Sequence, residues 1–126
     1  MDSKPKIVTL CGSSKYADIM AVCAWLIEKQ ENAIALGLHF LPVWYGDIPD
    51  HLAEHEGVSD KMDKRHLNKI DISNEIFVVN YHNYIGDSTT NEIMYALGKE
   101  MPIRRFTNDP IGEQVENMIS TFLGLK

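Results

Sequence analysis

The chain has 126 residues, 44% of them hydrophobic and 24% charged, and a net charge of −6. This length and composition predict one globular domain over residues 1–126. The acidic charge argues against a nucleic-acid polymer as partner, and the apolar runs are too short to cross a membrane. The amino terminus lacks a signal-like apolar stretch, and Cys11 and Cys23 follow no disulfide or metal pattern. We therefore expect two core thiols in a cytoplasmic protein.

The first part of the chain predicts strand, helix and strand. The apolar segment 6–11 predicts a strand. Apolar residues at helical spacing then predict a helix over 16–36, and Gly37 is typical of the residue that follows a helix end. A second strand is predicted over 38–44, where Pro42 favours a sheet edge.

The second part repeats the alternation. A helix is predicted over 60–74 and a buried strand over 75–80. The next helix is predicted to begin near Thr89 and to end at Gly98, and it is followed by a strand over 102–106 and a helix over 110–123. The apolar side of the helix over 60–74 is predicted from four residues: Met62, Leu67, Ile70 and Ile72.

This alternation predicts an α/β fold, a doubly wound parallel sheet of four to five strands that is flavodoxin-like or Rossmann-like. The expected strand order, numbered along the chain, is 2-1-3-4. That order brings the loops at Gly12 and Gly86 to one edge of the sheet, where ligands bind in such folds.

The segment after the third strand combines a glycine, hydroxyl groups and a carboxylate. Gly86, Ser88 and Thr89 are suited to a polyhydroxylated or anionic ligand, and Glu92 would face the same crevice. The same letters, Thr89-x-x-Glu92, also form a capping box, and the pattern alone favours that interpretation.

A second polar loop follows the first strand. Gly12, Ser13, Ser14 and Lys15 are suited to binding a 5′-phosphate or a ribose. The alternative is a serine helix cap beside a solvated lysine. The loop is not a Walker A motif, and no G-x-G-x-x-G follows the strand, so we predict no cofactor.

The segment His51–His55 matches H-x-x-E-H, a metalloprotease pattern. It lies between Pro49 and Gly57, in a stretch too short for the helix that such a site requires. We therefore predict no metal site.

Four further residues have less specific surroundings. Trp25 and Trp44 are predicted to be core residues, while Tyr45 is the aromatic residue best placed to line a site. Asp71 ends a helix, and its position alone favours a solvated side chain.

Three segments, 8–16, 66–75 and 80–99, resemble the nucleoside 2-deoxyribosyltransferase-like superfamily in order and spacing. Within the last one, residues 84–93 are similar to the G-Y-I-G-E-S-T-x-x-E-I run of small bacterial and phage members. The characterised relatives are deoxyribosyltransferases and 2′-deoxynucleoside 5′-monophosphate N-glycosidases. The resemblance therefore implies cleavage or transfer at the N-glycosidic bond of a nucleoside or nucleoside 5′-monophosphate.

The resemblance also implies roles for individual residues. Glu92 corresponds to the nucleophile that forms a glycosyl-enzyme ester, and Asp71 to a residue that contacts the sugar or assists base departure. Gly12, Ser13 and Lys15 correspond to the loop that seats the 5′ end. The chain departs from its relatives at Thr9, where they commonly carry Tyr, and at Lys15, where some carry Arg.

Substrate and assembly complete the expectations. The donors of Ser13, Ser14 and Lys15 favour a 5′-monophosphate over a free nucleoside. The alternative function is a non-catalytic nucleotide-binding or sensing protein that uses the same pocket. A homodimer or larger homo-oligomer is expected, from the resemblance and from four apolar residues that association would cover: Ile85, Met94, Met118 and Leu125.

Overall fold

The structure, a computed structural model, describes residues 3–42, 44–45 and 56–124. In these residues it forms a sheet of four parallel strands in the order β2-β1-β3-β4. The strands are β1 (Lys6–Gly12), β2 (Ala33–Leu36), β3 (Glu75–Val79) and β4 (Ile103–Arg105). The predicted α/β class, parallel pairing and strand order are confirmed, and the fold is of the doubly wound, flavodoxin-like or Rossmann-like type.

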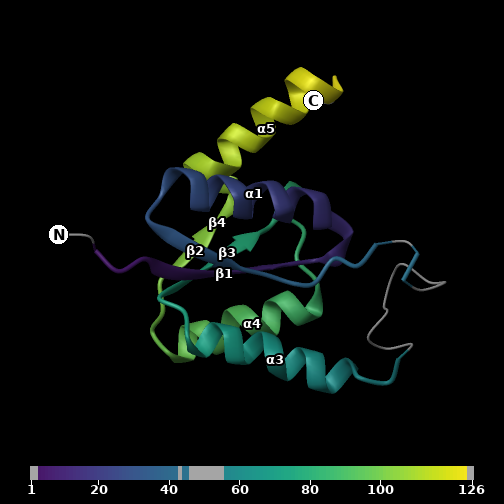
Figure 1. Ribbon diagram of the computed structural model, residues 1–126, viewed down its shortest axis with the longest axis vertical. Coiled ribbons are helices and arrows are strands. Elements are labelled where there is room, and N and C mark those ends of the chain that lie inside the picture. The colour runs from purple at the N-terminus through teal and green to yellow at the C-terminus, as the bar shows by residue number, and fades with distance from the viewer. Residues whose placement is uncertain (1–2, 43, 46–55, 125–126) are drawn as a thin grey trace.

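Helices cover both faces of this sheet (Figure 1). Helices α1 (Ala17–Gln30) and α5 (Pro110–Leu123) lie on one face, and α3 (Ser59–Asp71) and α4 (Asp87–Gly98) lie on the other. Three short 3-10 turns follow strands or precede helices: η1 (Ser14–Tyr16), η2 (Tyr81–Asn83) and η3 (Phe106–Asn108). In the described part of the chain, no helix is long and apolar enough to span a membrane.

The pleat of the central strands builds two separate cores. Leu10 and Phe77 face α1 and α5, whereas Cys11 and Val78 face α3 and α4. Cys11 is paired with Val78 across the sheet, so β1 and β3 end at nearly the same level. The loops that follow these two strands therefore share the carboxyl edge of the sheet, as predicted.

The predicted second strand over 38–44 is wrong. Helix α1 ends at Gln30 rather than at residue 36, and β2 occupies Ala33–Leu36. The apolar residues of β2 continue the spacing of the helix before it, so periodicity alone does not mark the boundary. Gly37 consequently follows a strand and does not end a helix, although β2 does lie at a sheet edge.

Polar side chains hold this edge. The Glu28 carboxylate accepts a hydrogen bond from the backbone N–H of Ala35 at 2.8 Å. Farther along, Lys69 of α3 donates to the Gly37 carbonyl at 2.6 Å. The edge strand is thus bound to α1 on one side of the sheet and followed by a contact with α3 on the other.

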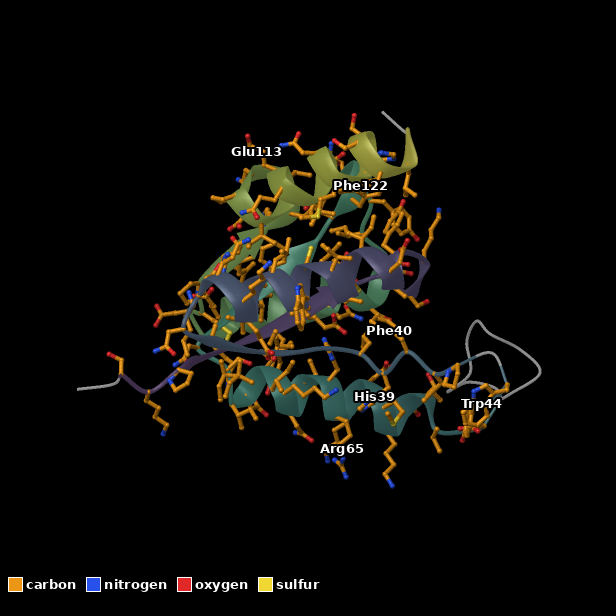
Figure 2. The ribbon with its side chains drawn as sticks, turned by 45° about the horizontal axis from the view of Figure 1, so that its top comes forward. His39, Phe40, Trp44, Arg65, Glu113 and Phe122 are labelled. Atoms are coloured by element: carbon orange, nitrogen blue, oxygen red, sulfur yellow. The ribbon has the colours of Figure 1, made fainter. Side chains whose placement is uncertain are left out.

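The two tryptophans are not core residues, contrary to expectation. Trp25 is 67% exposed on α1, and Trp44 is 83% exposed and lies apart from the sheet and helices (Figure 2). Trp25 lies on the outer side of α1, where the buried residues of that helix leave it no core neighbour.

The predicted helix over 110–123 is confirmed as α5. Its start follows the sequence signals, because the Asp109 carboxylate accepts a hydrogen bond from the Ile111 N–H and Pro110 occupies the first turn. Gly112 allows the helix to approach η3, since a Cβ at that position would lie 1.9 Å from the Phe106 carbonyl oxygen.

Candidate functional site

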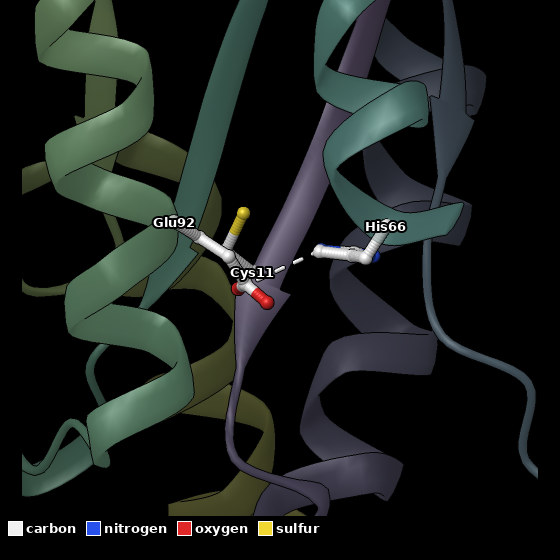
Figure 3. A group of neighbouring side chains, drawn as sticks. All are labelled: Cys11, His66 and Glu92. Carbon is white, nitrogen blue, oxygen red and sulfur yellow. Dashed lines mark ion pairs between the residues drawn. The ribbon is translucent and has the colours of Figure 1, made fainter. Parts of the chain in front are cut away.

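Three reactive side chains meet between the sheet and the α3–α4 layer (Figure 3). Cys11 comes from the end of β1, His66 from the middle of α3 and Glu92 from the middle of α4. They are 0%, 3% and 9% exposed, respectively. The fold thus places a thiol, an imidazole and a carboxyl group together just below the carboxyl edge of the sheet.

The three groups are close together, and the imidazole is the one whose polar atoms lack partners. One ligand atom of each lies within 4.8 Å of the other two. The His66 Nε2 is 3.7 Å from the Glu92 Oε1, beyond hydrogen-bond distance. Within the described residues, neither nitrogen of the His66 ring has a hydrogen-bond partner, although the ring is buried. Buried polar atoms are rarely left unpaired, so this ring needs an explanation.

Burial sets the protonation of the two acidic groups. It raises the pKa of Glu92 to about 7, with a smaller increase from Asp63 and an opposing decrease from the Cys11 thiol. Burial also raises the pKa of Cys11, and the nearby Glu92 adds to that increase. At neutral pH the thiol is therefore protonated, and Glu92 is divided between its two forms.

The histidine is shifted in the opposite direction. Burial and, to a smaller extent, the charge of Lys69 lower the pKa of His66 to about 4, against an opposing interaction with the Leu10 backbone. His66 is consequently neutral at pH 7, and each of its nitrogens is either a donor or an acceptor. No ion pair with Glu92 forms at that pH.

The structure contradicts the capping-box interpretation of Thr89 and Glu92. Helix α4 begins at Asp87 with Gly86 as its cap, so Thr89 lies inside the first turn and is buried. The Gly86 carbonyl accepts a hydrogen bond from the Thr90 hydroxyl at 3.0 Å. Glu92 therefore faces the sheet, with Cys11 and His66 as neighbours, and does not cap the helix.

The other residues of this loop lie at the edge of the sheet. Gly86 is extended, with a φ of −89°, so no backbone strain demands glycine there. Ser88 is exposed in the first turn of α4. Both residues are open to the surface near the carboxyl edge, whereas Thr89 points into the protein.

The loop after β1 is only partly as predicted. A Cβ at Gly12 would lie 3.1 Å from the Met20 sulfur and 3.2 Å from Val79, so this glycine fits tight internal packing. Ser13 caps the short turn η1 by accepting a hydrogen bond from the Lys15 N–H at 3.2 Å. Because α1 begins only at Ala17, these hydroxyls do not lie at the start of a long helix.

Ser14 and Lys15 are accessible, and Lys15 connects the two polar loops. Ser14 and Lys15 lie in η1 and are not buried. The Lys15 Nζ lies 4.9 Å from the centre of the Tyr84 ring and 5.8 Å from that of Tyr16. The Tyr16 and Tyr84 rings meet edge to face at 6.1 Å. The loops that follow β1 and β3 therefore touch at the carboxyl edge.

Asp71 lies apart from the group of three. It is exposed at the last position of α3, where its carboxylate accepts a hydrogen bond from the Tyr95 hydroxyl at 2.5 Å. It also forms an ion pair with Lys99 at 3.0 Å. Asp71 thus lies at the end of α3 that leads into β3. Glu92 lies instead beside Cys11, near the carboxyl end of β1.

Tyr45 is likewise not brought to Glu92. Its hydroxyl donates to Glu56 at 3.0 Å on the surface. The H-x-x-E-H segment, 51–55, at which we predicted no metal site, lies outside the described residues.

Two hollows in the described part of the molecule lie elsewhere. One of about 510 Å³ is formed by η3 and the first turns of α5. The other, of about 300 Å³, lies between α1 and residues 37–40. Glu92 lines neither of them.

Sequence reasoning missed the part that His66 plays. The predicted apolar side of its helix included Met62 and Ile72, yet these are 38% and 62% exposed, and the buried residues are His66 and Ile70. The spacing of four residues between His66 and Ile70 was the available signal. Cys11 is a buried thiol, as predicted, but its neighbour is a carboxyl group.

Comparison with known proteins adds no assignment, since no family model, curated protein or solved structure matches this chain.

Proposed function

We propose that this protein cleaves or transfers the N-glycosidic bond of a nucleoside or nucleoside 5′-monophosphate through Glu92. The observation that carries the proposal is the position of that carboxyl group. It is buried below the carboxyl edge of a parallel sheet, and the described residues place no lysine or arginine within ion-pair distance of it. A carboxyl group kept in such surroundings is a candidate for chemistry.

The proposed chemistry uses the ionised form of Glu92. A carboxylate oxygen attacks the anomeric carbon, the bond to the base breaks with its electron pair leaving on the base, and a glycosyl ester forms. Water or a second base then resolves the ester. With a pKa of about 7, a substantial fraction of Glu92 is ionised at neutral pH.

The polar loops support the proposed substrate class. Ser14, Lys15 and Ser88 are accessible at the edge under which Glu92 lies. Lys15 forms no ion pair within the described residues, so its charge is available to a phosphate. We assign Asp71 no part in the proposed mechanism, because its carboxylate contacts Tyr95 and Lys99, and its predicted role stays a prediction.

The test measures free base by liquid chromatography after incubation with ribo- and deoxynucleosides and their 5′-monophosphates. Glu92→Ala should reduce base release by several orders of magnitude, because the nucleophile is lost. Glu116→Ala, an exposed change on α5, is the matched control and should cleave normally. Base release by Glu92→Ala at the native rate would refute the proposal.

The same panel separates the alternative function. A native chain that binds a monophosphate in calorimetry but releases no base would be a nucleotide-binding or sensing protein. Equal affinity for a nucleoside and its monophosphate would show that Lys15 does not select phosphate.

Association into a homodimer or larger homo-oligomer stays a prediction. Ile85 and Met94 are 37% and 63% exposed, Met118 is half-buried, and Leu125 lies outside the described residues. Light scattering at micromolar concentration would test it.

A further inference from the structure

We propose that Cys11, His66 and Glu92 bind a divalent transition-metal ion, with Zn²⁺ as the expected ion. The site is distinct from any pattern in the sequence, because its three ligands come from β1, α3 and α4.

The spacing of the three groups suits one ion. Zinc bonds of 2.0–2.3 Å in a tetrahedron place ligand atoms about 3.5 Å apart. The His66 Nε2 and the Glu92 Oε1 are 3.7 Å apart, and all three ligand atoms lie within 4.8 Å of one another. A contraction of about 1.3 Å at most, from 4.8 Å to about 3.5 Å, would bring them to bonding positions, and side-chain rotation can supply it.

His66 gives a second, independent indication. It is 3% exposed, and neither ring nitrogen makes a hydrogen bond of normal geometry in the part of the chain that the structure describes. The Leu10 backbone lies close enough to interact with one nitrogen, and the other nitrogen is left for a metal ion. A metal ion would use the lone pair of one nitrogen, and a neutral imidazole is the form that ligates.

The donor set selects the type of metal. A thiol, an imidazole and one carboxylate suit Zn²⁺ or Co²⁺, whereas Mg²⁺ and Ca²⁺ require mainly oxygen ligands. Three protein ligands leave a fourth position for water or another small molecule. Binding would displace the Cys11 thiol proton to solvent, together with the proton carried by the protonated fraction of Glu92.

One consequence rests on the proposed function. A Glu92 carboxylate bonded to the metal has its negative charge partly neutralised and is a weaker nucleophile, so the ion would inhibit base release. Metal binding itself does not depend on any reaction.

The test titrates the chelator-treated full chain with Co²⁺ and records its absorption spectrum. We expect one equivalent to bind, with a thiolate-to-cobalt charge-transfer band, visible bands of a four-coordinate ion, and proton release measured with an indicator dye. Zn²⁺ should displace the cobalt, abolish these bands and raise the melting temperature.

Variants assign the ligands. Cys11→Ser should weaken Co²⁺ binding by roughly 100-fold or more and remove the charge-transfer band. Cys23→Ser is the matched control, because Cys23 is also 0% exposed but lies in the core on the opposite face. Circular dichroism verifies that each variant is folded, and the native spectrum alone tests the thiolate ligand if Cys11→Ser does not fold.

Two results would overturn the metal site: a native cobalt spectrum without a thiolate band, or equal losses in Cys11→Ser and Cys23→Ser. If the protein binds the metal but releases no base, with or without the metal bound, the metal site is supported and the proposed function is refuted. If base release depends on Glu92 but the chain binds no Co²⁺, the proposed function is supported and the metal site is refuted.

Discussion

The two faces of the sheet bury charged groups in opposite ways. On the α1–α5 side, the Arg104 guanidinium of β4 donates hydrogen bonds to Glu31, Glu75 and Asp109, at 2.8–3.1 Å. On the α3–α4 side, the nearest basic group to the Glu92 carboxyl among the described residues is the neutral His66, 3.7 Å away. On the α1–α5 face the guanidinium is paired with carboxylates, whereas on the α3–α4 face the Glu92 carboxyl has no charged partner among the described residues.

The difference separates a structural cluster from a functional candidate. Arg104 links the end of α1, the start of β3 and the cap of α5, so its contacts have an evident stabilising role. The group formed by Cys11, His66 and Glu92 has no such explanation. Groups held in unfavourable surroundings are more often retained for chemistry or binding than for stability.

The largest expected effect breaks the paired cluster. Arg104→Met would leave three carboxylates facing one another without the guanidinium, although Lys6 stays near Glu31 and Glu75 at 3.3–3.4 Å. Removing one partner from a fully buried ionic network costs about 3–5 kcal/mol, and because this network is only partly buried the loss should be about 2–3 kcal/mol. Urea unfolding followed by circular dichroism at pH 7 measures the free energy of unfolding.

Arg105→Met is the matched control, since the neighbouring residue points to the other face and its replacement should cost less than about 1 kcal/mol.

A pH series sharpens the comparison. Burial raises the pKa of Glu31 and of Asp109, but hydrogen bonds from Arg104 outweigh it, so both pKa values lie below normal. Their contribution is present above their ordinary pKa values and is lost as pH falls through the lowered ones. The native advantage over Arg104→Met should therefore shrink below about pH 4. A constant difference would contradict the pairing.

An effect of opposite sign, at most as large, is expected on the other face. Glu92→Gln should stabilise the metal-free protein at pH 8, because ionising a buried carboxyl with a pKa of about 7 costs up to about 3 kcal/mol. Because the pKa of Glu92 is raised in the folded state, its contribution to stability is fully present below the ordinary pKa of a glutamate and is lost as pH rises through 7. The gain should therefore vanish near pH 4 to 5, where the native carboxyl is protonated.

Unfolding with a chelator present, at pH 8 and at pH 5, measures this gain. Glu116→Gln on the surface of α5 should show neither change. Destabilisation by Glu92→Gln at pH 8 would mean that the carboxylate has a partner that stabilises it.

The smallest effect is expected at Asp71. Asp71→Asn removes the charge from an exposed contact with Tyr95 and Lys99, and exposed pairs contribute little. Neither the unfolding midpoint nor base release should change measurably. A large loss of base release with an unchanged midpoint would restore the role that the family resemblance implies for Asp71.

The fold could be predicted wherever the local signals agree. The start of α5 at Pro110 and the apolar strand β3 each combine pattern and propensity, and both were predicted correctly. Strand β2 could not be placed, because its alanines and alternating apolar residues fit a helix as well as a strand. Only its pairing with β1 distinguishes the two states.

The site was predictable at Glu92 but not around it. The carboxylate follows a strand-to-helix turn, and that local pattern is visible in the sequence. Cys11 and His66 join it through the register of β1 and the rotation of α3, which are tertiary features. The capping-box error has the same origin, since the helix begins two residues earlier than the pattern indicated.

The hydrogen bond between Glu28 and the Ala35 N–H also bears on how the molecule meets other copies of itself. An edge strand presents unpaired backbone donors that another strand can bind, which is a common route to aggregation. On β2 one of these donors is already held by a carboxylate. An incoming strand would have to displace that group and accept a negative charge beside its own carbonyl oxygens. The contact therefore disfavours edge-to-edge pairing between β2 strands of two copies.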